Sequence, residues 1–258
     1  MGFLSDLLER VRADLERSPI DDSALMARVL NLPPARDFAG ALRSAAPPAL
    51  IAEVKRASPS AGRIADEQDP GRRAAAYEAA GAAAVSVLTE PRHFDGSLAD
   101  LRAVRLSTTV PVLRKDFLIH PAQVIESRAE GADAVLLIAA ALSEPELKGM
   151  LAAAADLGLG ALVEAHSRED LEKALATDAE VVGVNARDLE TLEVDGERAL
   201  ALLARVPAER LAVMESGVSS PEHVRRAMDA GARAILVGEA LMRAADSREK
   251  IRELRGQG

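Results

Sequence analysis

Short apolar segments alternate with segments of helical periodicity along most of the chain, and this alternation restricts the fold more than any other feature. The apolar segments have the length of buried strands, at residues 49–55, 83–88, 110–114, 134–138, 160–164, 180–184, 211–215 and 234–237. The helical segments lie between and after them, at residues 69–79, 97–105, 121–129, 144–157, 168–175, 196–204, 220–229 and 246–254. Strands that alternate with helices form parallel sheets, and eight such units close into a barrel. We predict an α/β fold, a single (β/α)8 TIM barrel.

The joints between helices and strands repeat one motif. Gly81, Gly131 and Gly231 each precede a short run of small and apolar residues that starts a predicted strand. A glycine in this place is typical of a helix C-cap, where the backbone takes the left-handed conformation. The distances between these glycines are near multiples of one strand–helix unit, which supports the barrel.

The first 48 residues precede the barrel pattern and contain their own helical segments, at residues 3–16, 21–30 and 37–42. This stretch is too long to be only a leader. We therefore expect residues 1–48 to form an N-terminal helical extension that packs over one end of the barrel, and residues 49–258 to form the catalytic barrel domain.

Composition excludes several classes of function. The length of 258 residues suits one barrel, and the formal net charge of −9 disfavours nucleic acid as a partner. The chain has no cysteine, which rules out disulfides, thiolate catalysis and cysteine-ligated metals. Neither a signal peptide nor an apolar run long enough to cross a membrane is evident. We expect a cytoplasmic protein, and a monomer because the sequence has no clear exposed apolar stripe.

Two ionisable residues interrupt the first predicted strand. Glu53 and Lys55 are two residues apart, so both side chains project from the same face of the strand. A buried carboxylate or ammonium is costly unless it is paired or used in chemistry. Residues 56–62 then form a small-residue turn that suits oxyanion binding. The simpler interpretation is a strand end followed by a polar turn.

Polar side chains end later strands as well, at Lys115, Glu164, Asn185 and Glu215. The carboxyl ends of barrel strands meet at one mouth, where active sites of this fold lie. Lysines and glutamates that are partly desolvated there can serve as general acids and bases. Two other interpretations stay open. Lys115 and Glu164 can form a structural ion pair, and Glu215 can be a packing or supporting residue and not a catalytic one.

The loops after the last two strands favour phosphate. Ser216-Gly217 and Gly238-Glu239 each lead into a helix, and glycine lets backbone N–H groups approach an anion. We interpret four other charged strand-end residues as structural salt bridges: Arg56, Arg114, Asp116 and Asp188. The histidines lie in loops or helix starts without metal-ligand spacing, and so we predict no metal: His93, His120, His166 and His223.

Together these stretches resemble a known family, indole-3-glycerol phosphate synthase of tryptophan biosynthesis. The matching segments follow the family's order and are Ile-Ala-Glu-Val-Lys-Arg-Ala-Ser-Pro-Ser at 51–60, Ser-Val-Leu-Thr-Glu at 86–90, Pro-Val-Leu-Arg-Lys-Asp-Phe at 111–117, Ala-Leu-Val-Glu at 161–164, Gly-Val-Asn-Ala-Arg-Asp-Leu at 183–189 and Glu-Ser-Gly-Val at 215–218. The resemblance extends from about residue 37 to the end.

The resemblance implies a carboxy-lyase that needs no cofactor. The substrate would be an anthranilate-derived ribulose phosphate, 1-(2-carboxyphenylamino)-1-deoxyribulose 5-phosphate, whose indole ring closes with loss of CO2 and water. Lys115 resembles the general acid that activates the substrate carbonyl, and Glu164 resembles the acid/base group of the later dehydration. Lys55 resembles the residue that holds the anthranilate carboxylate. Glu53 and Asn185 would complete the polar network around the reacting atoms.

The resemblance also implies the substrate-binding residues, which are Ser58, Phe117, Arg187, Ser216, Gly217, Gly238 and Glu239. The serine at 58 and the two glycines match phosphate-loop positions, and Phe117 would contact the aromatic ring. Glu239 departs from many members of the family, which have a small residue such as serine here. A carboxylate repels phosphate, so we expect only the Glu239 backbone to contribute.

Two alternative functions are weighed against this one. Phosphoribosylanthranilate isomerase is a related phosphate-binding barrel, but it is expected to use a catalytic cysteine, and this chain has none. A barrel that binds a sugar phosphate without converting it would have no need of Lys115 and Glu164, and both are present. The synthase is therefore favoured.

Overall fold

Eight parallel strands form a closed barrel in the computed structural model, which describes residues 2–59, 62–63 and 69–256. In the order of the chain these strands are β1 (Ala49–Val54), β4 (Ala84–Leu88), β5 (Val112–Lys115), β6 (Ala134–Ile138), β7 (Gly160–Ala165), β8 (Val181–Asn185), β9 (Leu211–Glu215) and β10 (Ala234–Val237). Each strand pairs with its neighbours in sequence order, and β1 closes the barrel between β4 and β10. The predicted (β/α)8 fold is confirmed.

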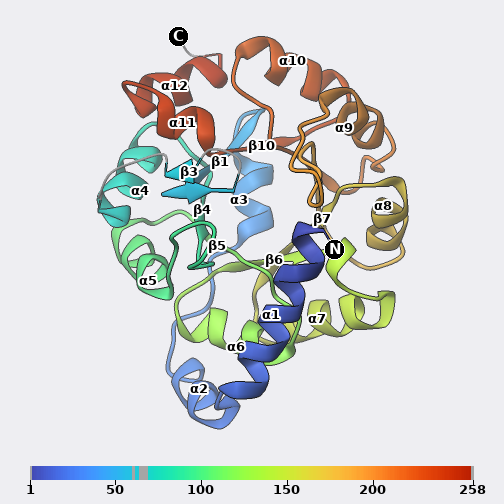
Figure 1. The fold of residues 1–258 in the computed structure, drawn as a ribbon. Coiled ribbons are helices and arrows are strands. Elements are labelled where there is room, and N and C mark those ends of the chain that lie inside the picture. Colours follow the sequence, from blue (N-terminus) through green and yellow to red (C-terminus); the bar gives the residue numbers. More distant parts are fainter. Residues whose placement is uncertain (1, 60–61, 64–68, 257–258) are drawn as a thin grey trace.

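Helices surround the barrel as a ring (Figure 1). They are α4 (Pro70–Ala79), α5 (Leu98–Ser107), α6 (Pro121–Ala129), α7 (Glu144–Asp156), α8 (Arg168–Leu175), α9 (Gly196–Leu203), α10 (Pro221–Asp229) and α12 (Ser247–Leu254). Three short elements were not among the predicted ranges: the 3-10 turn η1 (Ala139–Ala141), the helix α11 (Glu239–Arg243), and the hairpin of β2 (Ala57–Ser58) and β3 (Gly62–Arg63). These short elements lie between barrel units and leave the eightfold alternation intact.

Local sequence signals explain where the elements begin and end. Gly81, Gly131 and Gly231 have φ values of +97°, +97° and +101°, so each stands in the left-handed conformation predicted for it. Strand β5 begins after Pro111, which has no N–H to donate to the sheet, and it extends to Lys115 because Lys115 pairs with Leu88. Strand β5 therefore ends on Lys115, one of the residues predicted for the site.

The N-terminal helices reach both ends of the barrel. Helix α3 (Phe38–Ser44) packs against the amino ends of the strands, where the Phe38 side chain lies beside Gly160 at the start of β7. Helix α2 (Asp22–Val29) packs on α6 outside the barrel. Helix α1 (Phe3–Arg17) crosses the front of the ring in Figure 1. The N-terminal helices thus lie at two ends of the barrel, α3 at the amino end and the start of α1 at the carboxyl end.

Phe38 is the largest side chain that α3 buries, with an exposed fraction of only 1%. Replacing Phe38 with alanine should lower the free energy of unfolding by about 3–5 kcal/mol, the usual cost of a large cavity. Urea unfolding measures this loss. Leu106→Ala is the control, because Leu106 is 88% exposed and should change stability by less than about 0.5 kcal/mol. Equal effects of the two substitutions would show that α3 adds nothing to the barrel core.

Candidate active site

A cavity of about 520 Å³ opens at the carboxyl ends of the barrel strands. All of the residues predicted for the site line this cavity: Glu53, Lys55, Ser58, Lys115, Phe117, Glu164, Asn185, Arg187, Ser216, Gly217, Gly238 and Glu239. They come from the ends of six barrel strands and from the loops that follow, so residues far apart in sequence meet at one mouth. Phe3 of α1 also lines it, which no pattern in the sequence indicated.

At the floor of the cavity, one ammonium group lies between two carboxyl groups. Lys115 Nζ lies 2.8 Å from Glu164 Oε2 and 3.3 Å from Glu215 Oε2. The two glutamates are each 1% exposed. Asn185 donates from Nδ2 to Glu164 Oε2 at 3.1 Å. Barrel strands β5, β7, β8 and β9 therefore place one cation, two acids and an amide within contact of each other.

The three ionisable groups at the floor shift one another's pKa. Burial by itself disfavours the Lys115 ammonium, but the nearby carboxyl groups, Glu164 first among them, outweigh burial and raise the pKa of Lys115. Burial likewise disfavours the Glu164 carboxylate, yet Lys115 and then His166 lower its pKa well below the usual value. Burial and the Glu164 charge raise the pKa of Glu215 well above its usual value. The favoured state is a charged Lys115–Glu164 pair beside a neutral Glu215.

A second ion pair lies on β1. Lys55 Nζ is 2.9 Å from Glu53 Oε1, and Glu53 is 4% exposed. Gly238 leaves the space that Glu53 occupies, because a Cβ on this glycine would collide with the Glu53 carboxylate. Gly183 does the same for Glu215. The two glycines are thus needed for room, and Glu53 and Lys55, which the sequence places on one face of the strand, form an ion pair.

The loops after β9 and β10 form one side of the cavity. Ser216 and Gly217 have φ values of +60° and +71°, and left-handed backbone is uncommon for serine. Such a serine is held by its surroundings, and residues of this kind gather at functional sites. Gly238 precedes α11, whose first residue Glu239 also lines the cavity. Backbone groups of both loops can therefore approach a ligand at this side.

Glu239 directs its carboxylate to arginines. Its Oε1 accepts from Arg243 Nε at 2.9 Å, and its Oε2 lies 3.7 Å from Arg187 Nη2. Arg187 also donates from Nη1 to the Leu192 carbonyl at 2.8 Å. The negative charge of Glu239 is thus compensated by two guanidinium groups that line the same cavity.

Apolar and aromatic side chains also line the cavity. Phe117 and Phe94 lie with ring centroids 6.4 Å apart, and both line the cavity. Leu189 and Leu192 line it as well. The site therefore combines a charged floor with an apolar flank that can receive an aromatic ring.

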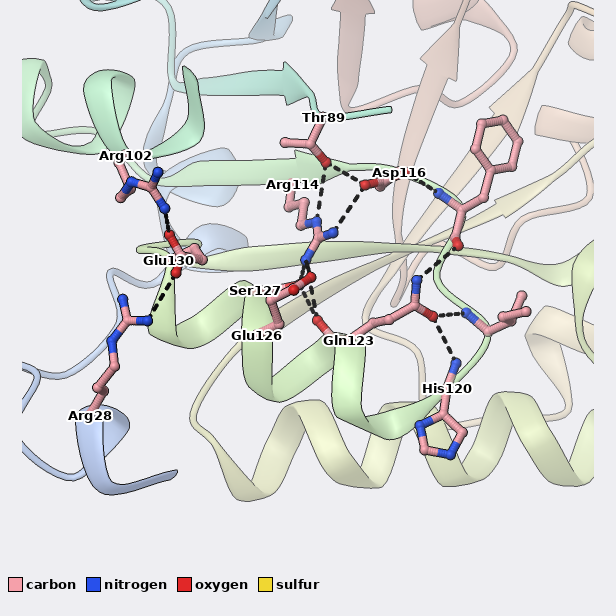
Figure 2. A network of polar contacts seen from close by, with 12 residues as sticks. Arg28, Thr89, Arg102, Arg114, Asp116, His120, Gln123, Glu126, Ser127 and Glu130 are labelled. Carbon is pink, nitrogen blue, oxygen red and sulfur yellow. Dashed lines mark hydrogen bonds and ion pairs between the residues drawn. The ribbon is translucent and has the colours of Figure 1, made fainter. Parts of the chain in front are cut away.

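Arg114 stands behind this wall in a buried network of polar contacts (Figure 2). Its guanidinium donates from Nε to Thr89 Oγ1 at 3.1 Å, from Nη1 to Glu126 Oε2 at 2.8 Å and from Nη2 to Asp116 Oδ2 at 3.0 Å. Asp116 Oδ1 in turn accepts from the Phe117 backbone N–H at 2.9 Å. The residues on each side of Lys115 are thus fixed to neighbouring elements, which agrees with the predicted structural role of Arg114 and Asp116.

The other predicted structural salt bridges are present too. Arg56 forms a two-point pair with Asp100, at 2.5 and 2.7 Å. Asp188 lies 3.5 Å from Arg198. The first pair ties the loop after β1 to α5, and the second ties the loop after β8 to α9.

His166 is a site neighbour to which the sequence analysis gave no role. It follows β7 directly, and its Nε2 lies 3.2 Å from Glu164 Oε1. The sequence did indicate that His166 lies beside Glu164, because two residues that are two positions apart at a strand end share a face of the strand, as Glu53 and Lys55 do. Among the residues that the structure describes, no group of three or more potential ligands is arranged to hold a metal ion. In the same part of the chain, no helix is long and apolar enough to cross a membrane.

The indole-3-glycerol phosphate synthase family model matches residues 4–254. The chain is 50% identical to the indole-3-glycerol phosphate synthase of Parafrankia sp. (strain EAN1pec), over 98% of this chain and 95% of that protein. It is 48% identical to that of Nocardioides sp. (strain ATCC BAA-499 / JS614), over 99% of both. The chain belongs to the indole-3-glycerol phosphate synthase family. Its function is that of the family, in tryptophan biosynthesis.

Solved structures of other enzymes share the fold of this family member. Thiamine phosphate pyrophosphorylase from Pyrococcus furiosus aligns with a TM-score of 0.61 at 18% identity, over 86% of this chain and 97% of that one. A 3-hexulose-6-phosphate synthase aligns with a TM-score of 0.63 at 19% identity, over 81% of this chain and 98% of that one. At such low identity these likenesses show the barrel fold alone.

Glu215→Gln should change how stability depends on pH. Because the folded state raises the pKa of Glu215 above the usual 4.5, it binds the proton more tightly than the unfolded chain. The wild type therefore loses free energy of unfolding as pH rises above about 4.5, by up to about 1.4 kcal/mol per pH unit for this group. Glutamine is always neutral and avoids this loss. In urea unfolding from pH 5 to 7.5, the free energy of unfolding of Glu215→Gln should rise relative to that of the wild type as the pH increases.

Glu172→Gln is the control for this comparison, since the Glu172 side chain is 61% exposed. It should follow the wild type at every pH. A pH-independent difference between Glu215→Gln and the wild type would mean that Glu215 is ionised in the folded protein.

Arg114→Lys should destabilise the protein although it keeps the positive charge. A lysine ammonium cannot reproduce the forked contacts to Thr89, Glu126 and Asp116, so buried acceptors lose their partners. We expect a loss of about 2–3 kcal/mol in urea unfolding. Arg102→Lys is the matched control, because the Arg102 side chain is 50% exposed and its buried partner Glu130 keeps an ion pair with Arg28 (Figure 2). It should cost less than about 0.5 kcal/mol, and a similar cost at both positions would contradict a special role for the Arg114 network.

Proposed function

We propose that the cavity residues carry out closure of the indole ring of 1-(2-carboxyphenylamino)-1-deoxyribulose 5-phosphate, with loss of CO2 and water, and that Lys115 is the general acid. The observation that carries this proposal is the buried cluster of Lys115, Glu164 and Glu215 at the cavity floor. Its ammonium is held protonated by the glutamates, as a proton donor requires. No cofactor takes part in the proposed reaction.

The substrate has three recognisable parts that fit the lining. Lys55 would hold the anthranilate carboxylate, and Phe117 would contact the aromatic ring on the apolar flank. Ser58, Gly217 and Gly238 would bind the phosphate, with Ser216 and Arg187 beside them. In this orientation the carbonyl carbon of the sugar chain would lie over the floor, between Lys115 and the ring carbon that attacks it.

The first step forms a carbon–carbon bond. The ring carbon that bears the carboxylate attacks the ketone carbon, and Lys115 gives a proton to the oxygen as it becomes negative. The carboxylate then leaves as CO2, and its bonding electrons restore the aromatic ring. A carboxylate held out of bulk water by Lys55 leaves more readily. Glu53 supports Lys55 through the ion pair of 2.9 Å.

Dehydration follows. The hydroxyl group leaves as water, and a proton is removed from the five-membered ring so that the indole double bond forms. Glu164 is the proposed acid/base group, since its low pKa keeps it an anion that can accept a proton. Asn185 supports it through the hydrogen bond to Oε2.

Glu239 would assist the phosphate through its backbone alone. Its carboxylate is compensated by Arg187 and Arg243, so it does not need to face the phosphate as a free charge. A phosphate that enters would compete with Glu239 for these guanidinium groups.

The remaining properties are also proposals. We propose that residues 1–48 form the helical extension and residues 49–258 the catalytic barrel, and that the protein works as a monomer in the cytoplasm. Its partner would be the small-molecule substrate, without nucleic acid or membrane. The net charge of −9 supports the absence of nucleic acid from this set.

Lys115→Ala should reduce turnover of the synthetic substrate about 1,000-fold or more in kcat, because it removes the general acid and the counter-charge of Glu164. Turnover is followed by indole fluorescence against the low background of a chain without tryptophan. Lys148→Ala is the matched control, because Lys148 lies at the surface with its side chain 52% exposed, and it should retain wild-type activity. A folded Lys115→Ala with near wild-type kcat would disprove the assignment. A wild type that binds the substrate without converting it would favour a binding protein instead.

A further inference from the structure

His166 lies against the one oxygen of Glu164 that faces away from Lys115. Glu164 Oε2 accepts from Lys115 at 2.8 Å and from Asn185 at 3.1 Å. Glu164 Oε1 instead lies 3.2 Å from His166 Nε2. The two oxygens therefore have different partners. Lys115 and Asn185, beside Oε2, line the cavity, whereas His166, beside Oε1, does not.

His166 is held in this position by its own surroundings. The residue is 6% exposed, and its backbone N–H donates to Asp170 Oδ2 at 3.2 Å in the first turn of α8. Neither ring nitrogen makes a well-aligned hydrogen bond with a described residue. The imidazole thus lies within contact distance of Glu164 but is not committed to another partner within the described part of the chain. Hydrogen bonds of catalytic groups often tighten only when the substrate is bound.

The chemistry creates a need for such a group. Once Lys115 has given its proton to the substrate, it is neutral, and Glu164 loses the cation that compensates its charge. A buried carboxylate without compensation is costly. Asn185 supplies one neutral donor to Oε2, and the neutral Glu215 can donate to the same carboxylate. The ring nitrogen beside Oε1 is Nε2 of His166, at 3.2 Å.

We propose that His166 is a positioning residue for Glu164. Its Nε2–H holds Oε1 and keeps Glu164 a correctly oriented carboxylate after Lys115 has lost its proton, so that Oε2 can accept the proton of the dehydration step. This inference rests on the proposed acid/base role of Glu164. The charged and titratable groups that face this pair are Lys115 on β5, Glu215 on β9 and Asp170 on α8.

Three substitutions separate positioning from packing. His166→Phe keeps a ring of similar size without nitrogen, His166→Gln retains an N–H near the place of Nε2, and His166→Asn carries its amide nearer the place of Nδ1. We expect His166→Phe to lower kcat about 10- to 100-fold with KM within about 3-fold of wild type. His166→Gln should recover most of the loss, and His166→Asn should not. The low-pH limb of the kcat profile should move to higher pH in His166→Phe, because Glu164 loses a group that lowers its pKa.

The same exchange in a Glu164→Gln background is the decisive measurement. Glutamine cannot accept the proton, so His166→Phe should change the residual kcat less than 2-fold there. Equal losses in both backgrounds, or a change in KM alone, would overturn the inference and leave the role of Glu164 intact. A Glu164→Gln variant with wild-type kcat would overturn the role of Glu164 and this inference with it. Far-UV circular dichroism and urea unfolding verify that each variant is folded, and if His166→Phe is not, the contrast between glutamine and asparagine decides the question.

Discussion

The burial of one ammonium group between two carboxyl groups determines the protonation states at the floor of the site. An isolated Lys115 at the floor of a barrel would lose its proton, because burial favours the neutral amine. The Glu164 carboxylate, first among the groups that raise the pKa of Lys115, reverses this preference. The two carboxyl groups cannot both be ionised cheaply at this distance, so Glu215 takes the neutral form. The protonation state of Lys115 therefore depends on the two carboxyl groups beside it, and the proposed proton donor does not act alone.

The barrel makes this cluster possible at low entropic cost. Lys115, Glu164 and Glu215 lie at or near the carboxyl ends of β5, β7 and β9, where backbone pairing with neighbouring strands fixes each Cα. The Arg114 network then anchors β5 to α6 directly behind Lys115. The absence of a side chain at Gly183 and Gly238 leaves room for the carboxyl groups of Glu215 and Glu53. The folded strands and helices thus set the positions of these three residues before any ligand binds.

The local sequence pattern was enough to predict the barrel. Other features of the site depend on tertiary contacts, which the sequence pattern does not contain. The strand ranges agree with the structure to within two residues, because glycine C-caps and apolar runs act locally. Twelve site residues converge because strand ends must meet in a closed barrel. By contrast, Phe3 reaches the mouth only through the path of α1, which no periodicity encodes. The compensation of Glu239 by Arg187 depends on a loop conformation, which is set by side-chain contacts far apart in sequence.

The neutral state of Glu215 also bears on substrate binding. The chain carries a net charge of −9, while the substrate brings a carboxylate and a phosphate of the same sign. An ionised Glu215 beside Glu164 would repel both groups inside a cavity where charges are poorly screened. The raised pKa of Glu215 favours its neutral form and reduces that repulsion. In the proposed function, Lys55 and Arg187 would then attract the two anionic ends, so the burial that raises the pKa of Glu215 would also help an acidic protein to accept an acidic substrate.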